Sequence, residues 1–483
     1  MQLRLESLSK TELEKIHSAT LTVLEKTGVK VESEEVRELL KSHGASIDGS
    51  VAKLPSSMVE KFISKINKSV TLASRDSEHD LILPAENTLN CTSGYAAYIY
   101  DIVTGEYRQS TLEDLIDFTV LADALDEVDL FWPIVMPTEF KSEEYQEVAA
   151  LDIALRNTTK HVQCSLSTAK TAELQIELAA ALLGGKDKLR DTPIFSVVAS
   201  PFTPLEFKKG TAEGYLKMAR AGVPVVPMNV PLAGTTAPAT LAGSIVITNA
   251  EQLATLVILK CADEDAPMVY SSDTGTADMK TGDINYDSPD RPILCAAMAQ
   301  VTRYYEIPSC VSHDSCEDKE YSTRQGFERN ALRIAMNEMT HSDIAVWMGS
   351  RDDALSASMW DLLLDAEALH LANEYNRRFE VDDNTLAVEA IDDAGPSGNF
   401  ISSKHTVKNF RKQICMYDYN KNFIFAGSNQ SDPQNDLSDT EFVRRAKFRV
   451  REILKSHKPE RIPEDKIAAM DEVMEKVRRE LNG

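Results

Sequence analysis

The sequence predicts an α/β fold, a (β/α)8 TIM barrel with an N-terminal helical cap and a C-terminal helical tail. Three observations predict it. Eight short apolar segments alternate with amphipathic helical segments along the central part of the chain. Most of these segments are continuously apolar, as expected for parallel strands that helices cover on both faces. Polar side chains follow several of them, where parallel α/β folds carry their functional groups.

Composition limits the classes of protein to consider. The chain has 483 residues, of which 43% are hydrophobic and 27% are charged, as in an ordinary globular protein with a large core. Its formal net charge of -24 disfavours a nucleic-acid partner. The sequence has neither an apolar run of membrane-spanning length nor a signal-peptide core, so we expect a cytoplasmic protein. Seven scattered cysteines without a CxxC pair favour free thiols.

Residues 1–88 are predicted to form the N-terminal helical cap. Ser9 and Glu12 have the spacing of a capping box at the start of a helix that ends at Gly28. A second helix is expected to begin near Ser33, and a third follows a proline. No residue pattern here indicates chemistry, and packing is the expected role.

Residues 89–412 are predicted to form the barrel domain, and residues 413–483 a charged, helical C-terminal extension. A hairpin around Thr104-Gly105 is expected after the first strand. The eight predicted strands lie at 90–94, 130–136, 161–165, 193–199, 224–229, 267–272, 308–313 and 343–349. A doubly wound open sheet is the alternative, but no GxGxxG opens any helix, which disfavours its dinucleotide-binding form.

Polar and aromatic side chains gather after the predicted strands, where a barrel would bring them to one mouth. They are Tyr95, Tyr98, Glu139, Ser165, Ser167, Phe202, Asn229, Asp273, His313, Asp314, Glu317, Lys319, Ser350 and Arg351, with Trp347 inside the last strand. Ring faces and carboxylates together suit a methylated ammonium, which has no N–H group to donate. The alternatives are core packing for each aromatic ring, a structural role for His313 and a loop cap for Asp273.

The sequence motifs disfavour a zinc enzyme and a hydrolase. The sequence contains neither HxH nor HxxxH, which disfavours zinc, and no GxSxG elbow, which disfavours a hydrolase.

Several segments resemble the trimethylamine methyltransferase (MttB) family. They are DIVTGEYRQST, NTTKHVQCS, SPFTPLEF, GVPVVPMNVPLAGTTAPATLAGSIVITNAEQLA and NTLAVEAIDDAGPSGNFISSKHT, within residues 90–412. The resemblance implies a (β/α)8 barrel that transfers a methyl group from a methylated amine to the cobalt of a separate corrinoid protein. The cobalamin would then belong to the partner, and this chain would bind no metal.

The resemblance also implies a branch of the family. Archaeal trimethylamine enzymes carry pyrrolysine in a loop after the seventh strand, and Lys319 stands at the corresponding position here. Ser322 and Arg324 stand where the family usually shows an Asp and a Gln. The chain therefore resembles the non-pyrrolysine branch, whose members demethylate quaternary amines such as glycine betaine, proline betaine or carnitine. A quaternary nitrogen already carries a neutral leaving group, so we expect no catalytic group beyond those that position the substrate.

The expected binding site combines a cage with a carboxylate contact. Tyr95, Tyr98 and Trp347 are the expected cage, with Asn229 beside them and Asp273 supplying negative charge. His313 or Arg351 is expected to bind a substrate carboxylate. The alternatives are a tertiary methylamine methyltransferase, a zinc-dependent corrinoid methyltransferase, another barrel enzyme such as a lyase, and a non-catalytic betaine-binding barrel. A homo-oligomer is left open.

Overall fold

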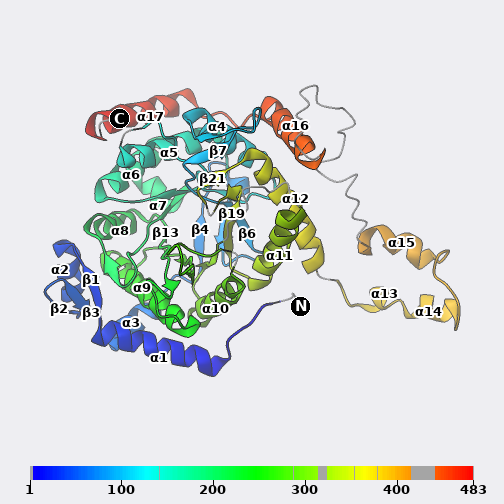
Figure 1. The fold of residues 1–483 in the computed structure, drawn as a ribbon, viewed down its shortest axis with the longest axis horizontal. Helices are drawn as coiled ribbons and strands as arrows, with labels where there is room; N and C mark the ends of the chain where they lie inside the picture. Colours follow the sequence, from blue (N-terminus) through cyan, green and yellow to red (C-terminus); the bar gives the residue numbers. More distant parts are fainter. Residues whose placement is uncertain are drawn as a thin grey trace.

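An inner layer of short parallel strands surrounded by helices forms the centre of the computed structural model (Figure 1). The structure describes residues 4–140, 142–286, 288–313, 324–352, 354–377, 379–414 and 441–481. Seven strands form one sheet, and every neighbouring pair in it is parallel. Across the sheet, the order is β13 (Val225–Val226), β11 (Phe195–Val198), β10 (His161–Ser165), β9 (Leu130–Phe131), β6 (Leu89–Thr92), β19 (Ile344–Met348) and β18 (Ser312–His313).

A separate parallel pair lies between the two edges of this sheet. Strand β15 (Tyr270–Ser271) pairs with β17 (Ser309–Cys310). A single bridge from Val225 to Met268 connects β13 with the residues just before β15. All eight predicted strand segments therefore contain strands, and the predicted α/β fold with a parallel sheet is confirmed.

Helices surround the strands on their outer side (Figure 1). They are α4 (Leu112–Asp123), α5 (Glu143–Asn157), α6 (Ala169–Leu183), α7 (Lys186–Asp191), α8 (Lys209–Ala221), α9 (Leu241–Ala262), α10 (Asp290–Tyr305), α11 (Arg324–Thr340) and α12 (Met359–Asn376). Hydroxyl side chains cap the N-termini of five of them, at Thr111, Ser142, Thr168, Thr240 and Ser358. Helices α6 and α8 end at glycines in the left-handed conformation.

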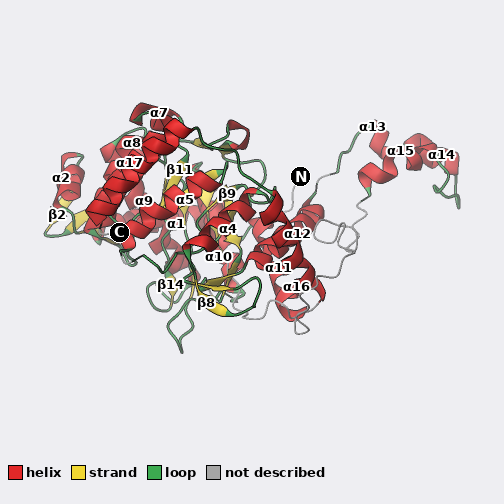
Figure 2. Cartoon of the chain, turned by 90° about the horizontal axis from the view of Figure 1, so that it is seen from above, coloured by secondary structure: helices red, strands yellow, loops and turns green. Residues whose placement is uncertain are grey.

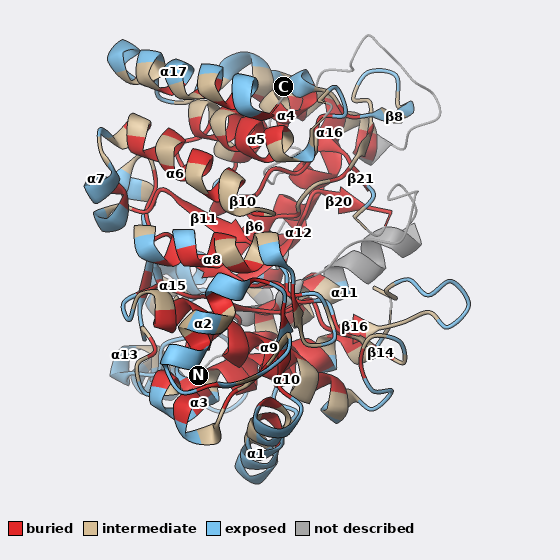
Figure 3. Ribbon diagram, turned by 90° about the vertical axis from the view of Figure 1, so that its left-hand side faces the viewer, coloured by how far each residue is buried: buried red, intermediate tan, exposed pale blue. Residues whose placement is uncertain are grey.

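Strand residues alternate between two apolar clusters, which fixes the direction of each side chain. Leu130 and Val346 lie in an inner cluster, together with Trp132. Phe131 and Trp347, their neighbours in sequence, lie in the cluster between the strands and the helices. This is the period of two expected of a strand. The strands are buried on both faces, while helices such as α17 (Glu464–Leu481) expose their outer sides (Figure 3).

A hairpin covers one end of the inner cluster. Strands β4 (Val70–Leu72) and β5 (Leu81–Leu83) pair antiparallel and contribute apolar side chains to that cluster. Ala73 and Ala85 flank the hairpin and bond to Pro193 O and to the Asp343 carboxylate, just before strands β11 and β19 begin. The hairpin therefore lies at the N-terminal ends of the strands, and the opposite end is the candidate site.

The N-terminal region is not purely helical, which corrects the predicted cap. The three predicted helices are present as α1 (Lys10–Lys26), α2 (Glu34–Ser42) and α3 (Ser56–Ile63), and the capping box before α1 is confirmed. Between them, β1 (Val29–Val31), β2 (Ser46–Asp48) and β3 (Val51–Lys53) join β12 (Glu206–Phe207) in a four-stranded sheet. Three-residue strands with a distant partner leave no readable period, which explains the difference.

The predicted hairpin after the first strand is confirmed and belongs to a larger sheet. Strands β7 (Tyr98–Tyr100) and β8 (Tyr107–Gln109) pair antiparallel around Gly105. Strand β21 (Ser356–Ala357) adds to β7, and β20 (Ser350–Arg351) adds to β21. Because β7 follows β6 and β20 follows β19, this sheet lies at the C-terminal ends of the strands.

Helix α9 is the longest described helix, with 22 residues. Among the described residues, it alone is long and apolar enough to cross a membrane, with a mean hydropathy of 1.4. However, 72% of that window is buried inside the structure, as in the core helix of a globular protein.

The C-terminal part of the chain first projects away from the body and then packs against it again. Beyond α12, the short helices α13 (Asp383–Leu386), α14 (Val388–Ala394) and α15 (Lys404–Gln413) project away from the body (Figures 1 and 2). Helix α16 (Glu441–Ser456) then packs on α4 and α12, and α17 packs on α5 and α6. We call residues 379–414 the arm.

Candidate functional site

The loops that follow the strands at their C-terminal ends carry the candidate site. Tyr95 follows β6 and has a left-handed backbone with φ 65°. Its ring meets the Trp132 ring edge to face, with centroids 5.6 Å apart. The Tyr95 hydroxyl accepts a hydrogen bond of 2.7 Å from the Ser165 N–H, and burial raises the pKa of this phenol. The two rings therefore lie together over the inner cluster.

Gly94 permits this arrangement. A Cβ placed on Gly94 would lie 2.4 Å from the Trp132 indole ring, so any side chain there would displace the ring. The loop after β6 can rest directly on the indole because residue 94 has no side chain.

Two polar groups beside the aromatic pair are buried without a partner. Gln163 is fully buried, and neither its amide oxygen nor its amide nitrogen has a hydrogen-bond partner among the described residues. The Trp132 indole N–H is likewise buried and unpartnered within the described chain. Val162 pairs with Phe131 across strands β10 and β9, so Gln163 and Trp132 follow side by side and both point inward.

Leaving such groups unsatisfied has a free-energy cost of about 1–3 kcal/mol each. Most buried polar groups in proteins have partners, so each unpartnered group calls for an explanation, and a bound ligand or water is one such explanation. Gln163 and Trp132 were not among the predicted site residues, which follow the predicted strands with the exception of Trp347, whereas both of these residues lie inside predicted strand segments. The polar residues in the HVQCS segment, at every second position, were the available signal.

The other inward residue of β10 contrasts with Gln163. His161 is also fully buried, but its ring nitrogens bond to Ala73 O at 2.7 Å and to Ser196 Oγ at 2.9 Å. Burial lowers the pKa of His161 to about 4, so the ring is neutral at physiological pH. His161 is therefore a satisfied structural residue, and Gln163 is not.

Asn229 and Asp273 were predicted in the site, and the structure shows both already bound to protein groups. Asn229 points toward α9, where it donates to Glu251 at 2.6 Å and accepts from Gln252 at 3.1 Å. Asp273 is ion-paired with Arg291 and accepts a hydrogen bond of 3.1 Å from the Tyr286 hydroxyl. The positive charge of Arg291 offsets the negative charge expected from Asp273.

Tyr98 and Arg351 lie together in the four-stranded sheet rather than beside Tyr95. Tyr98 stacks on Tyr107 with ring centroids 4.9 Å apart. The Arg351 guanidinium is buried, pairs with Asp361 at 2.9 Å and lies 4.8 Å over the Tyr100 ring. These contacts tie the sheet to the start of α12, so the structure gives Arg351 a protein carboxylate where a substrate carboxylate was predicted.

The placement of Trp347 differs from the prediction. Its ring lies between the strands and the helices, and its indole N–H donates to Asn90 Oδ1 at 2.8 Å. The alternation along β19 turns Val346 inward and Trp347 outward, which separates Trp347 from the inner cluster. The tryptophan that lies beside Tyr95 is Trp132.

The loop after the seventh strand lies outside the residues that the structure describes. The backbone of His313 pairs with Val346 in the sheet, and its side chain is not described. Asp314, Glu317, Lys319 and Ser322 lie outside the described residues, as does the side chain of Arg324.

Two buried carboxyl groups hold the loops around the site. Glu147 accepts from the Ser167 hydroxyl at 2.9 Å and from its N–H at 3.2 Å. Glu251 accepts from Thr203 and from the Leu205 N–H. Burial raises the pKa of each carboxyl to about 7. Glu147 lies on α5 and Glu251 on α9, and each carboxyl therefore holds a loop that follows a strand against a neighbouring helix.

We expect Glu147→Gln to remove part of the pH dependence of stability. The folded pKa of Glu147, about 7, lies above its ordinary value of 4.5, so the folded chain binds more protons between these pH values. The contribution of protonated Glu147 to the free energy of unfolding is complete below pH 4.5. It is lost as the pH rises to about 7, where the buried carboxyl ionises. The substituted glutamine retains an acceptor oxygen for Ser167. At pH 8, the variant should exceed the wild type by up to about 3 kcal/mol in free energy of unfolding. Urea unfolding from pH 5 to pH 8 measures this, and parallel curves would contradict it.

Comparison with known proteins identifies the family. The model of the family described as "Trimethylamine methyltransferase (MTTB)" matches residues 2–482. This chain belongs to the MTTB family. The trimethylamine methyltransferase MttB of Desulfitobacterium hafniense is 30% identical over 99% of this chain and 95% of that protein. The glycine betaine methyltransferase of the same species is 26% identical over 84% of this chain and 85% of that protein.

A solved structure supports the fold of this MTTB family member. The monomethylamine methyltransferase MtmB of Methanosarcina barkeri superposes with a TM-score of 0.53 at 12% identity, covering 98% of this chain and 88% of MtmB. Identity this low concerns the fold alone. The predicted family is confirmed, and membership makes the chain a methyltransferase. Within the described part of the chain, no group of three or more His, Cys, Asp or Glu residues is arranged to hold a metal ion.

Proposed function

We propose that this protein transfers a methyl group from a quaternary amine of the betaine type to the Co(I) of a separate corrinoid protein. The observation that carries the proposal is the Tyr95–Trp132 pair together with the Trp132 indole N–H and the neighbouring Gln163 amide, which have no partner among the described residues. Relatives named as methyltransferases for trimethylamine and for glycine betaine support transfer from a methylated amine. The aromatic pair and the polar groups support the betaine over the tertiary amine.

The two parts of a betaine match the two parts of the site. A trimethylammonium group has no N–H to donate, and ring faces such as those of Tyr95 and Trp132 attract it. A carboxylate accepts hydrogen bonds from the Trp132 indole N–H and the Gln163 amide, which lack any other acceptor among the described residues. Trimethylamine offers no acceptor of this kind and would leave both groups unsatisfied.

The reaction then requires only positioning by this chain. The methyl group moves from nitrogen to the cobalt of the co-substrate, the C–N bond breaks, and its electron pair remains on the departing neutral amine. No proton is gained or lost. Orientation of one N–CH3 bond and exclusion of water are the protein's contributions, which suits a site built from aromatic rings and neutral donors. The cobalamin is carried by the partner protein.

We also propose that the strands close into a complete (β/α)8 barrel. Residues 309–313 carry both β17, which pairs with β15, and β18, which pairs with β19. The bridge from Val225 to Met268 links β15 to the other edge of the sheet. These pairings support a closed ring of eight parallel strands, with the site at its C-terminal mouth.

The rim of this mouth supports docking of a partner protein. Exposed apolar side chains in the segments that follow the strands are Val103, Tyr107 of β8, Leu112 at the start of α4, Phe202, Val230, Met279 and Leu355. The loops near β8 and near β14 (Leu232–Ala233) extend from the same side of the molecule (Figure 3). Exposed apolar groups near a functional site are typical of interaction surfaces. A corrinoid protein placed there would bring its cobalt over the site.

The cytoplasm is the proposed compartment. Cys91, Cys164, Cys261, Cys295 and Cys310 are buried free thiols. Free thiols suit a reducing compartment.

The first test is a spectroscopic transfer assay. The purified chain, a corrinoid protein held as Co(I) and individual amines are mixed, and the absorbance of the methylated corrinoid is followed. We expect methylation with a betaine and none with trimethylamine. Methylation with trimethylamine and with no quaternary amine would contradict the proposal. Calorimetric binding of a betaine without any methyl transfer would identify a binding protein instead.

A further inference from the structure

The arm, residues 379–414, contains no buried residue. It holds three helices, and every one of its side chains is exposed or half-buried. Helices of this length are unstable in water without packing against other groups, and a segment this short cannot bury a core of its own. The arm therefore needs a surface that the described body of its own chain does not provide (Figures 1 and 2).

The exposed side chains of the arm are apolar to an unusual degree. Ten large apolar residues are exposed there, out of twenty-one among the described residues. They are Phe379, Val381, Leu386, Val388, Ile391, Phe400, Ile401, Val407, Phe410 and Ile414. Ile401 is 86% exposed and Val407 is 78% exposed. Apolar exposure on this scale marks an interaction surface.

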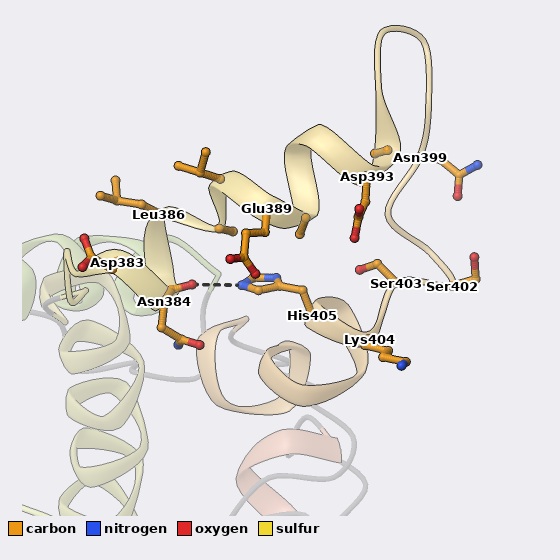
Figure 4. A pocket seen from close by; sticks show the side chains of 14 residues that line it. Asp383, Asn384, Leu386, Glu389, Asp393, Asn399, Ser402, Ser403, Lys404 and His405 are labelled. Carbon is orange, nitrogen blue, oxygen red and sulfur yellow. Dashed lines mark hydrogen bonds between the residues drawn. The ribbon is translucent and has the colours of Figure 1, made fainter.

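Charge divides the arm into two halves. The half before Gly395 carries acidic residues only, and the half after Asn399 carries basic residues only. The acidic residues are Glu380, Asp382, Asp383, Glu389, Asp392 and Asp393, and the basic ones are Lys404, Lys408, Arg411 and Lys412. Figure 4 shows the two halves facing each other across a pocket of about 860 Å³, between α14 and the start of α15. Within the described arm, no ion pair joins them.

The hydrogen bonds between the two halves of the arm join a neutral acceptor to either a histidine ring or a lysine. His405 Nε2 lies 3.3 Å from Asn384 O, and Lys408 Nζ donates to Asn384 Oδ1 at 3.2 Å. A second pocket, of about 300 Å³, has Phe379, Phe410 and Ile414 in its lining. The arm thus offers a pocket with an apolar part, protruding apolar side chains, and charges of both signs that form no ion pair with each other within the described arm.

From this we propose that the arm pairs with the same arm of a second copy of this chain, around a two-fold axis. A two-fold interface must be self-complementary, because the same surface serves on both sides. Two arms in antiparallel arrangement place each basic half on the other acidic half. Protruding residues such as Ile401 can contact Phe379, Phe410 and Ile414 in the partner's second pocket at the same time. A typical stable interface uses about 20–30 residues per partner, and the arm is longer than that.

The test is the oligomeric state of the full chain by sedimentation and light scattering at micromolar concentration. We expect the wild type to be a dimer and Ile401→Asp with Val407→Asp to be monomeric. The matched control is Leu332→Asp, a residue of α11 that is 63% exposed on the body, which should remain dimeric. Because the arm buries nothing in its own body, the thermal unfolding of the body should be unchanged in all variants.

Charge reversal tests the antiparallel pairing. Lys408→Glu with Arg411→Glu should weaken the dimer at least tenfold, and Asp392→Lys with Asp393→Lys should do the same. All four changes together in one chain should restore it, because the halves remain complementary. A monomeric wild type, or a dimer that survives Ile401→Asp with Val407→Asp, would overturn the proposal. The proposal would also fail if the wild type were a monomer and the arm were required only for binding the corrinoid protein.

Discussion

Trp132→Ala is expected to lower kcat/KM for a betaine about a thousandfold. In the proposed site, the change removes a desolvated cation–π contact of about 2 kcal/mol and a hydrogen bond to a charged group of about 1.5–3 kcal/mol. Together they amount to about 4 kcal/mol, and each 1.4 kcal/mol is a factor of ten. Trp132→Phe keeps a ring but removes the indole N–H, which has no partner among the described residues, and should lower kcat/KM about 10- to 100-fold. Steady-state kinetics with the corrinoid protein in excess measures both.

Trp347 provides a matched control. Trp347→Phe also removes an indole N–H, but that group is bonded to Asn90 between the strands and the helices. We expect this variant to lose about 1–3 kcal/mol of stability and to keep its kcat/KM. Equal kinetic losses in the Trp132 and Trp347 variants would show that the site has been placed on the wrong face of the strands.

Gln163→Leu is expected to lower kcat/KM for a betaine by up to about a hundredfold and, unusually, to stabilise the fold. The amide has no partner among the described residues, so leucine removes a buried unsatisfied group whose cost is about 1–3 kcal/mol. The kinetic loss should be small for a quaternary amine without a carboxylate, such as tetramethylammonium. That difference separates carboxylate binding from a general disturbance of the site.

Gln252 is the control for Gln163. It is also a fully buried glutamine, but its amide donates to Asn229 Oδ1 and accepts from the Ser271 N–H. Gln252→Leu should therefore lower the free energy of unfolding. If Gln163→Leu is destabilising to the same degree, its amide has a structural partner and the proposed contact with the substrate fails.

Strand positions could be predicted because their signal is local. A continuous apolar run such as LFWPIVM shows that a strand is buried on both faces. Helix starts could be predicted for the same reason, since a hydroxyl or carboxyl residue caps N–H groups within its own turn, as at Ser9. The short strands β1 and β3 could not, because β1 depends on pairing with β12, far along the chain.

Side-chain direction was decided by the tertiary structure. A run that is apolar at every position does not show which face is inside, so Trp132 and Trp347 could not be told apart from sequence. The same holds for Asn229, which lies beside the inward Met228 and points instead to α9. Of the predicted cage, the structure keeps Tyr95 beside the inner cluster and gives it Trp132 as its neighbour.

The sequence by itself determined the family, the order of strands and helices, and the place of Tyr95 directly after the first strand. Each of these depends on residues that are close together in the chain. The tertiary structure decided which polar groups are already satisfied. Partners for Asp273, Arg351 and Asn229 come from other segments of the chain, and only the folded structure brings those segments together. It left Gln163 and Trp132 without partners among the described residues for the same reason.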